Sequence, residues 1–210
     1  MSDPAISDMI PTANGPTANG PIANGEDIGQ DGGTDLAATA RWLDSRYGYV
    51  SNLAQTLAHA PGALTPWLNL EQYCRQSSDL SERQRMLIIL VAVRDVSYCW
   101  PHYQPLARAA GLSEDQISLI QQGRVPQNLS TVEQVVCRIA NEIVLSRQIP
   151  HAMYDDIVKL LPSRQIVDVA VIASFYMAMG ALSVGLAVEI EDAEALRCEQ
   201  AHYRKTISLV

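Results

Sequence analysis

The chain has 210 residues, of which 48% are hydrophobic and 18% are charged, and its net charge is -8. This length is enough for one soluble domain with a sizeable core. The acidic balance and the lack of a basic stripe in the sequence argue against nucleic-acid binding. The four cysteines are widely spaced, and the sequence starts without the basic region and apolar core of a secretion signal. We therefore expect reduced thiols in a cytoplasmic protein.

Residues 1–33 have the composition of a tail. Residues 11–25 read PTANG-PTANG-PIANG, a five-residue repeat rich in proline, glycine and asparagine. Such a segment cannot bury enough apolar surface to offset the chain entropy that folding removes. We expect it to be disordered, ahead of a globular domain over residues 34–192.

Helical patterns follow one another through this domain. Capping boxes begin three of the helices, at Ser81, Ser113 and Ser130. The alternation that is typical of strands is absent from the sequence. We therefore predict an all-α, single-domain fold of about eight helices, with residues 193–210 as a last helix or an arm. The expected helices are 34–47, 49–60 (ended by Pro61 and Gly62), 66–76, two within 80–112, then 113–123, 130–147, 151–161 and 163–188.

The last of these helices contains a long apolar run. Residues 169–188 are twenty consecutive uncharged residues, which meets the length rule for a membrane span. Acidic residues flank the run, however, and it is rich in small residues that allow neighbouring helices to approach closely. We expect a buried helix or a subunit interface and no membrane span. The small residues are Ser174, Ala178, Ala181 and Gly185.

The most informative stretch is the helix that contains Pro101. A proline is tolerated in the first turn of a helix, where its missing N–H would have no partner anyway. The helix therefore begins near Tyr98, and Cys99 lies at its N-terminus, where the helix dipole lowers the pKa of a thiol and attracts anions. His102 and Tyr103 follow three and four residues later, so both can share the face of Cys99.

These residues carry a resemblance to a known family. The segment resembles the carboxymuconolactone decarboxylase family, which includes alkyl hydroperoxidase D-like (AhpD-like) proteins. Redox members of that family carry E-(x)11-C-x-x-C-x-x-x-H. Gln84, Val96, Cys99 and Tyr103 occupy these four positions here, and His102 precedes the last of them by one residue.

Decarboxylase-type members of the family show Y-E-W instead. Tyr98 and Trp100 match its two aromatic residues, with Cys99 in place of the glutamate. The resemblance extends to Tyr176 and covers most of residues 34–192. It implies an all-α fold, assembly as trimers or hexamers, and chemistry on a small-molecule substrate without a cofactor.

The leading functional hypothesis is a lyase or isomerase, such as a decarboxylase, that acts on a small cyclic or unsaturated acid, lactone or ketone through an enolate. His102 would move the proton, and Tyr103, Tyr98 or the helix N-terminus would stabilise the oxyanion. Flat side chains would line the substrate pocket, a cation would pair with a substrate carboxylate, and an amide would orient a carbonyl. Trp100 and Tyr176 would be the flat side chains, Arg83 the cation and Gln84 the amide.

Two alternatives stay open. Cys99 could reduce peroxide, as in AhpD-like peroxidases with peroxiredoxin-type activity, through a one-cysteine cycle or by pairing with Cys137 or Cys74, since the sequence has no C-x-x-C. The protein could also be a non-catalytic oligomeric binding protein, because the family's motif residues are replaced. Metal binding is not expected, since Cys99 and His102 supply only two ligands at suitable spacing.

Overall fold

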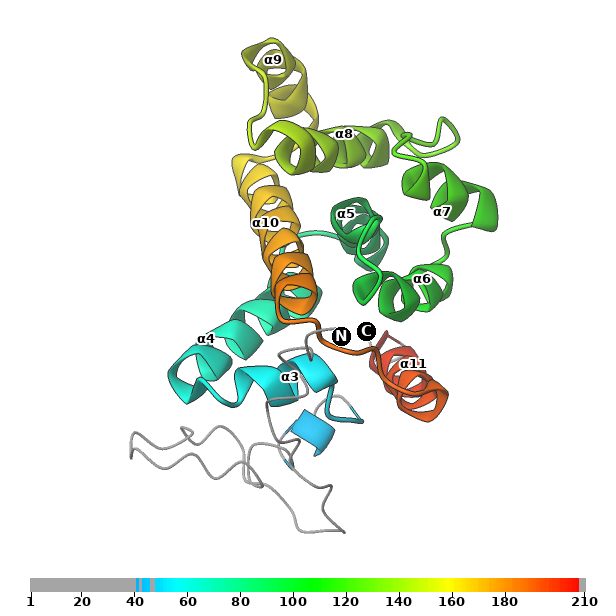
Figure 1. Cartoon of the computed structure of the whole chain (residues 1–210). Helices are drawn as coiled ribbons and strands as arrows, with labels where there is room; N and C mark the ends of the chain where they lie inside the picture. Colours follow the sequence, from blue (N-terminus) through cyan, green and yellow to red (C-terminus); the bar gives the residue numbers. More distant parts are fainter. Residues whose placement is uncertain (1–40, 42, 46–47, 208–210) are drawn as a thin grey trace, which may run out of the picture. The chain divides into compact units, whose positions relative to one another are not determined.

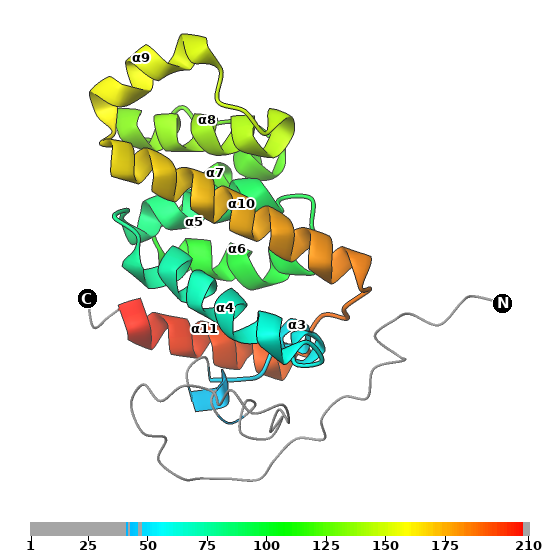
Figure 2. The same ribbon diagram turned by 90° about the vertical axis from the view of Figure 1, so that its left-hand side faces the viewer.

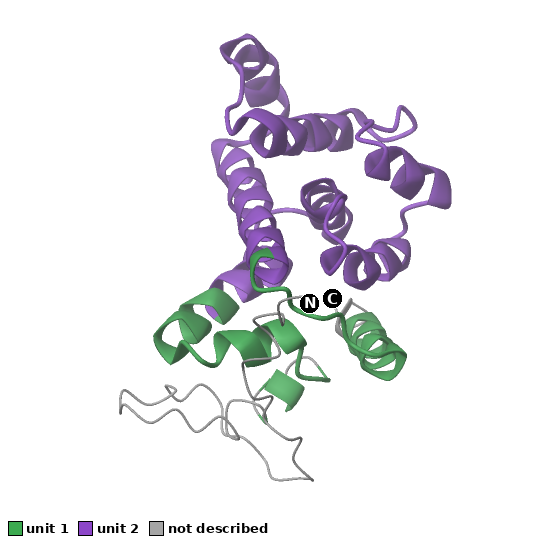
Figure 3. Ribbon diagram, in the orientation of Figure 1, with its two compact units in different colours: residues 1–68, 185–210 green, residues 69–184 purple. Residues whose placement is uncertain are grey.

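The structure is a computed structural model that describes residues 41, 43–45 and 48–207. The repeat tail and most of the first expected helix lie outside these residues. The chain divides into two compact units, residues 1–68 with 185–210 and residues 69–184, shown in Figure 3. Every regular element in the described residues is a helix, which confirms the all-α prediction.

The larger unit, residues 69–184, contains most of the helices (Figure 1). α4 leads into it and continues directly as the π-helix η1. The elements are α4 (Pro61–Gln72), η1 (Tyr73–Ser77), α5 (Glu82–Val93), α6 (Cys99–Ala109), α7 (Glu114–Gln121), α8 (Thr131–Ser146), α9 (His151–Leu160) and α10 (Ser163–Gly185).

Helix α5 is the centre of this unit. All eight residues from 86 to 93 are buried, because the sequence is apolar on every side of the helix. α5 packs against η1, α6, α7 and α8, and Figures 1 and 2 show α10 along its remaining side. Each fully buried leucine or isoleucine contributes about 1.5–3 kcal/mol to folding, so this helix anchors its neighbours.

All three predicted capping boxes are present. Ser81, Ser113 and Ser130 each accept a hydrogen bond from the backbone N–H three residues on. The glutamine or glutamate at that position accepts a hydrogen bond from the backbone N–H of the serine in return. Each serine cap stabilises its helix by about 1 kcal/mol, so the starts of α5, α7 and α8 are fixed locally.

The bounds of α6 agree with the proline argument. Its first residue is Cys99, so Pro101 lies in the first turn. After the helix, Gly111 adopts φ +88, a left-handed conformation that glycine reaches without strain. Pro105 lies inside the helix, where it cannot donate a hydrogen bond to the carbonyl of Pro101.

The segment around Pro61 differs from the prediction. Pro61 is the first residue of α4, whereas the sequence pattern predicts a break there and a helix start at Pro66. Proline is well suited to the first position of a helix, and here that preference outweighs the breaking effect of the following glycine. Pro66 lies inside the same helix.

Helix α10 is long and apolar enough to cross a membrane, judged by length and composition alone. In its most apolar 18-residue window, 56% of the residues are buried inside the protein. Buried core helices of soluble proteins pass the same test, and the buried charged residue Asp168 lies on this helix. At Gly180, α10 approaches the loop after α5 so closely that an added Cβ would lie 2.8 Å from Val96 Cγ2.

The smaller unit contains α3 (Asn52–Leu57) and α11 (Ala193–Ile207). The segment that the sequence left as a helix or an arm is therefore a helix. Asn52 connects the two parts of this unit, because its backbone N–H donates to Glu191 Oε1 at 2.6 Å and its side chain donates to the Glu189 carbonyl at 3.0 Å.

Candidate active site

The candidate site begins at the turn between α5 and α6. The Val96 N–H donates to the Val93 carbonyl at 2.9 Å, and the Trp100 N–H donates to the Val96 carbonyl at the same distance. These two bonds close the turn and start α6 at Cys99, whose side chain is fully buried. The predicted position of the thiol at a helix N-terminus is therefore observed.

Four ring side chains form a continuous row beside this turn. The His102 ring lies 5.1 Å from the ring of Tyr98 and 6.4 Å from that of Tyr103, measured between ring centroids. Tyr103 meets Tyr176 of α10 edge to face at 5.0 Å. The exposed fractions of Tyr98, His102, Tyr103 and Tyr176 are 6%, 4%, 4% and 0%, so the row is buried throughout. Trp100 is half-buried on the same turn of α6.

The far end of the row holds two phenol groups with weak or absent acceptors. The Tyr103 hydroxyl donates to the Met179 sulfur at 3.5 Å, a weak interaction. The Tyr176 hydroxyl has no hydrogen-bond partner of ordinary length among the described residues. Burial raises the pKa of Tyr176 well above 10, although the nearby Arg75 and Tyr103 act in the opposite direction. Tyr176 is therefore a neutral donor at physiological pH.

Arg83 and Gln84 lie away from this row. α5 and α6 run in opposite directions, so the first turn of α5 lies beside the last turn of α6, where an Arg83 amino group donates to the Gly111 carbonyl. The eleven residues of α6 span about 16 Å at 1.5 Å per residue. Gln84 completes the capping box of Ser81. The structure thus places His102 and Tyr103 in one buried row, with Cys99 in the first turn of the same helix. Arg83 and Gln84 lie near the opposite end of the helix pair.

No known protein-family profile matches the sequence, and no curated protein matches it. Solved structures do resemble the chain. One is an uncharacterized peroxidase-related protein from Ralstonia eutropha JMP134 with an alkylhydroperoxidase AhpD core, at 13% identity and a TM-score of 0.66, covering 79% of this chain and 90% of that one. A peroxidase-related protein from Silicibacter sp. TM1040 has 16% identity and the same TM-score, and covers 81% of this chain and 91% of that one.

The chain has the AhpD-like fold. A third structure with this fold is the debrominase Bmp8, as a cysteine-to-alanine variant in complex with 2,3,4-tribromopyrrole. It has 13% identity and a TM-score of 0.63, and the match covers 80% of this chain and 90% of that one. The fold that the motif resemblance predicted is therefore confirmed, and its structural neighbours include an enzyme.

The four cysteines of the chain differ in environment. Cys74, Cys99 and Cys137 are buried, Cys198 is exposed, and all four are free thiols. Burial raises the pKa of Cys74 and of Cys137 to about 12. Because a thiol reacts as its thiolate, these two are poor resolving partners for Cys99 at neutral pH. Among the described residues, no group of three or more potential metal ligands occurs.

A second polar cluster escaped the sequence analysis. The Asp168 carboxylate is buried on α10 and accepts hydrogen bonds from the Tyr73 hydroxyl and, at 2.7 Å, from the Asp79 backbone N–H. Glu71 and Arg75 pair at 3.5 Å beside the π-helix. In the sequence, the only signal of this cluster is the acidic Asp168 next to the long apolar run 169–188, where it also fits the flank of a possible membrane span.

Proposed function

We propose that this protein is a cofactor-independent enzyme that acts on a small cyclic or unsaturated acid, lactone or ketone. The buried row of Tyr98, His102, Tyr103 and Tyr176 at the start of α6 is the observation that carries the proposal. It joins one proton carrier to several phenol donors in a setting without bulk water. In such a setting, hydrogen bonds to a developing oxyanion are stronger than in water.

The proposed chemistry is proton transfer next to a carbonyl group. His102 removes a proton from the carbon beside the carbonyl, and the electron pair of that C–H bond forms an enolate. The Tyr103 hydroxyl donates a hydrogen bond to the enolate oxygen. His102 then returns the proton to another carbon, which gives an isomer with no net change in oxidation state. In a β-keto acid the carboxylate leaves as CO2 and the same enolate is protonated.

Proton exchange tests this proposal without knowledge of the full reaction. The protein is incubated in D2O with a panel of cyclic ketones, unsaturated lactones and β-keto acids, and loss of the carbon-bound proton signal is followed by NMR. His102→Gln should slow exchange by roughly a hundredfold or more, the typical share of a general base. His59→Gln, an exposed histidine, is the matched control. Equal exchange rates in the wild type and His102→Gln would remove His102 from the mechanism.

A second candidate function is thiol chemistry at Cys99. Cys99 is the first residue of α6, at a helix end whose partial positive charge is available to an anionic sulfur, whereas its full burial opposes the charge as it does at Cys74 and Cys137. The neighbours named as peroxidase-related or as a debrominase support this alternative. The thiolate would attack the O–O bond of a hydroperoxide and form a sulfenate and an alcohol. An external thiol would then form a mixed disulfide with Cys99 and release water. A second external thiol would free the Cys99 thiol and leave as the disulfide of the two external thiols. Peroxide consumption that persists in Cys99→Ser would exclude this reaction.

We also propose that the protein assembles with itself as a trimer or hexamer. The C-terminal half of α10 supports this, since Val184 is 61% exposed and Ala178 and Ala181 are exposed on the same helix. Light scattering on the wild type and on Val184→Glu tests the assembly. A non-catalytic binding role would be indicated if neither His102→Gln nor Cys99→Ser altered any measured turnover.

A further inference from the structure

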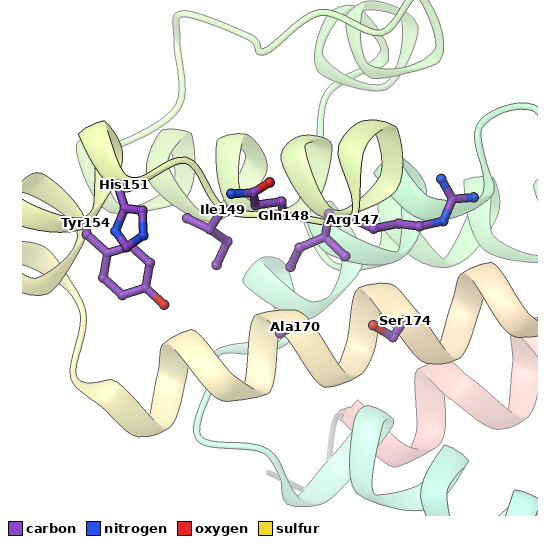
Figure 4. Close-up of a pocket in the computed structure, with 8 residues that line it drawn as sticks. Arg147, Gln148, Ile149, His151, Tyr154, Ala170 and Ser174 are labelled. Carbon is purple, nitrogen blue, oxygen red and sulfur yellow. The ribbon is translucent and has the colours of Figure 1, made fainter.

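A hollow of about 510 Å³ lies between the α8–α9 connection and α10, on the surface of the larger unit (Figure 4). This volume lies in the range of small-molecule pockets, about 300–1,000 Å³. Its apolar part consists of Ile143, Ile149 and Ala170. Figure 4 shows the guanidinium of Arg147 at one end and the rings of His151 and Tyr154 at the other.

The charge of this hollow is opposite to that of the chain. None of the eight described residues that line it is acidic, whereas Arg147 and His151 are basic. The whole chain carries a net charge of -8. Within the part of the chain that the structure describes, no carboxylate forms an ion pair with Arg147, and its side chain is exposed. Arginine recognises carboxylates through its planar set of N–H donors, so Arg147 is available to pair with an anion in this hollow.

The backbone conformation of Arg147 also supports a role for its side chain. Arg147 ends α8 in the left-handed conformation, with φ 58 and ψ 24. Glycine adopts this conformation without strain and is the usual residue there, whereas an arginine is strained. The cap requires only the backbone, whose N–H donates to the Ile143 carbonyl at 3.0 Å. The arginine side chain is therefore not explained by the cap.

The opposite end of the hollow suits a flat apolar group. The rings of His151 and Tyr154 lie 6.1 Å apart at an angle of 36°, and Ile149 lies between them and Arg147 (Figure 4). The Ser174 hydroxyl of α10 adds one polar group near Arg147. We propose that this hollow binds a small organic acid, with its carboxylate at Arg147 and Ser174 and its flat apolar body against Ile149 and Tyr154. The site is independent of the proposed reaction at His102.

Binding of three small probes to the full chain tests the proposal. Benzoate carries both the carboxylate and the ring, acetate only the carboxylate, and benzamide only the ring. Chemical-shift titration should show saturable benzoate binding with a Kd of about 1 mM or tighter, as suits so small a ligand. Acetate and benzamide should each bind at least roughly tenfold more weakly, because each lacks one half of the interaction.

Two variants locate the probe. Arg147→Gly keeps the left-handed cap and should weaken benzoate at least roughly tenfold, while the unfolding temperature stays the same or rises. Ser174→Leu fills the hollow without removing charge and should have the same effect on binding. Arg124→Gly removes an equal charge elsewhere on the surface and should bind benzoate as the wild type does. Absence of saturable benzoate binding, or equal binding in Arg147→Gly, would overturn the proposal.

Discussion

The Tyr73 hydroxyl donates a hydrogen bond to the buried carboxylate of Asp168, ninety-five residues further along the chain. The bond joins the π-helix η1 to α10, and the backbone N–H of Asp79 donates a hydrogen bond to the other carboxylate oxygen at 2.7 Å. A buried carboxylate is costly unless its oxygens are paired. This pair of residues therefore holds the irregular end of α4 against the longest helix of the larger unit.

Removing the Tyr73 hydroxyl should destabilise the protein. Tyr73→Phe leaves one oxygen of Asp168 without its donor, which costs about 2 kcal/mol for a hydrogen bond to a charged group. Urea unfolding followed by circular dichroism measures the loss. Tyr154→Phe removes the hydroxyl of an exposed tyrosine and should change the unfolding free energy by less than about 0.5 kcal/mol. Equal unfolding free energies for Tyr73→Phe and the wild type would contradict this role.

Tyr73 should also make the unfolding free energy fall at alkaline pH. The hydrogen bond to Asp168, then burial, raises the pKa of Tyr73 above 10 in the folded protein. As the pH rises, the Tyr73 hydroxyl therefore loses its proton in the unfolded chain before it does so in the folded protein. The stabilisation from its hydrogen bond to Asp168 is complete below about pH 10. It is lost as the pH rises toward the pKa of Tyr73 in the folded protein. In Tyr73→Phe, the decline of the unfolding free energy between neutral and alkaline pH should be shallower than in the wild type.

Arg83 should act as a structural hub. Its guanidinium donates to Glu133 at 2.6 Å, to Gln116 at 3.0 Å and to the Gly111 carbonyl, so it connects α5 with α7, α8 and the end of α6. Arg83→Ala should lower the unfolding free energy by about 2–3 kcal/mol, because charged hydrogen bonds are lost and the half-buried Glu133 keeps its charge. Arg124→Ala, at an exposed arginine, is the control.

The unfolding free energy should fall more when the Arg83 side chain is removed than when the Gln84 side chain is removed.

Arg83 should also affect how stability depends on acid pH. Burial acts to raise the pKa of Glu133, but hydrogen bonds from Ser130 and Arg83 outweigh it and lower the pKa below 4.5. Glu133 thus contributes stability that is present above its unfolded pKa and is lost as the pH falls through its folded pKa. Arg83→Ala should therefore unfold at a higher pH during acid titration, which tryptophan fluorescence can follow.

Much of the fold is predictable because its signals are local. The capping boxes at Ser81, Ser113 and Ser130 depend on three-residue spacings, and Pro101 fixes the start of α6 by its missing N–H. The start of α4 at Pro61 was missed because proline followed by glycine is typical of turns as well as of a helix start. The π-helix was missed because its bonding differs from an α-helix by one residue and leaves no sequence pattern.

The candidate site was predictable in its local part only. His102 and Tyr103 share a face with Cys99 because helical spacing dictates it. Tyr176 was predicted as a wall of the pocket, whereas its edge-to-face contact with Tyr103 depends on how α10 packs and was not predictable from spacing. The roles assigned to Arg83 and Gln84 depended on distances between helices, which motif spacing does not contain. In the structure, both make hydrogen bonds around the first turn of α5.

Gly180 should tolerate no larger residue while Val96 is present. An added Cβ would lie 2.8 Å from Val96 Cγ2, and a β-branched side chain is too stiff to move away easily. Gly180→Ala gains about 1 kcal/mol of helix propensity but should lose about 1–3 kcal/mol to overpacking, for a net destabilisation. Adding Val96→Ala should recover most of the loss, because the two residues are in contact. A double variant as unstable as the sum of the single variants would rule out this contact.

The reactivity of the four cysteines should separate the two catalytic proposals. Iodoacetamide alkylates thiolates, so at pH 8 we expect rapid labelling of exposed Cys198 and little labelling of Cys74 and Cys137, whose pKa values are about 12. Mass spectrometry of the digested protein gives the labelled fraction at each site.

The labelling rate of Cys99 decides which of the two catalytic proposals is supported. Labelling of Cys99 faster than that of Cys74 and Cys137, and oxidation to a sulfenate by one equivalent of hydroperoxide, would favour thiol chemistry at the start of α6. An inert Cys99 beside an active His102 would leave the thiol as a buried hydrophobic group, which is how most free cysteines behave. The control is Cys198→Ser, which removes the exposed thiol and so prevents its label from masking slower reaction at the buried sites.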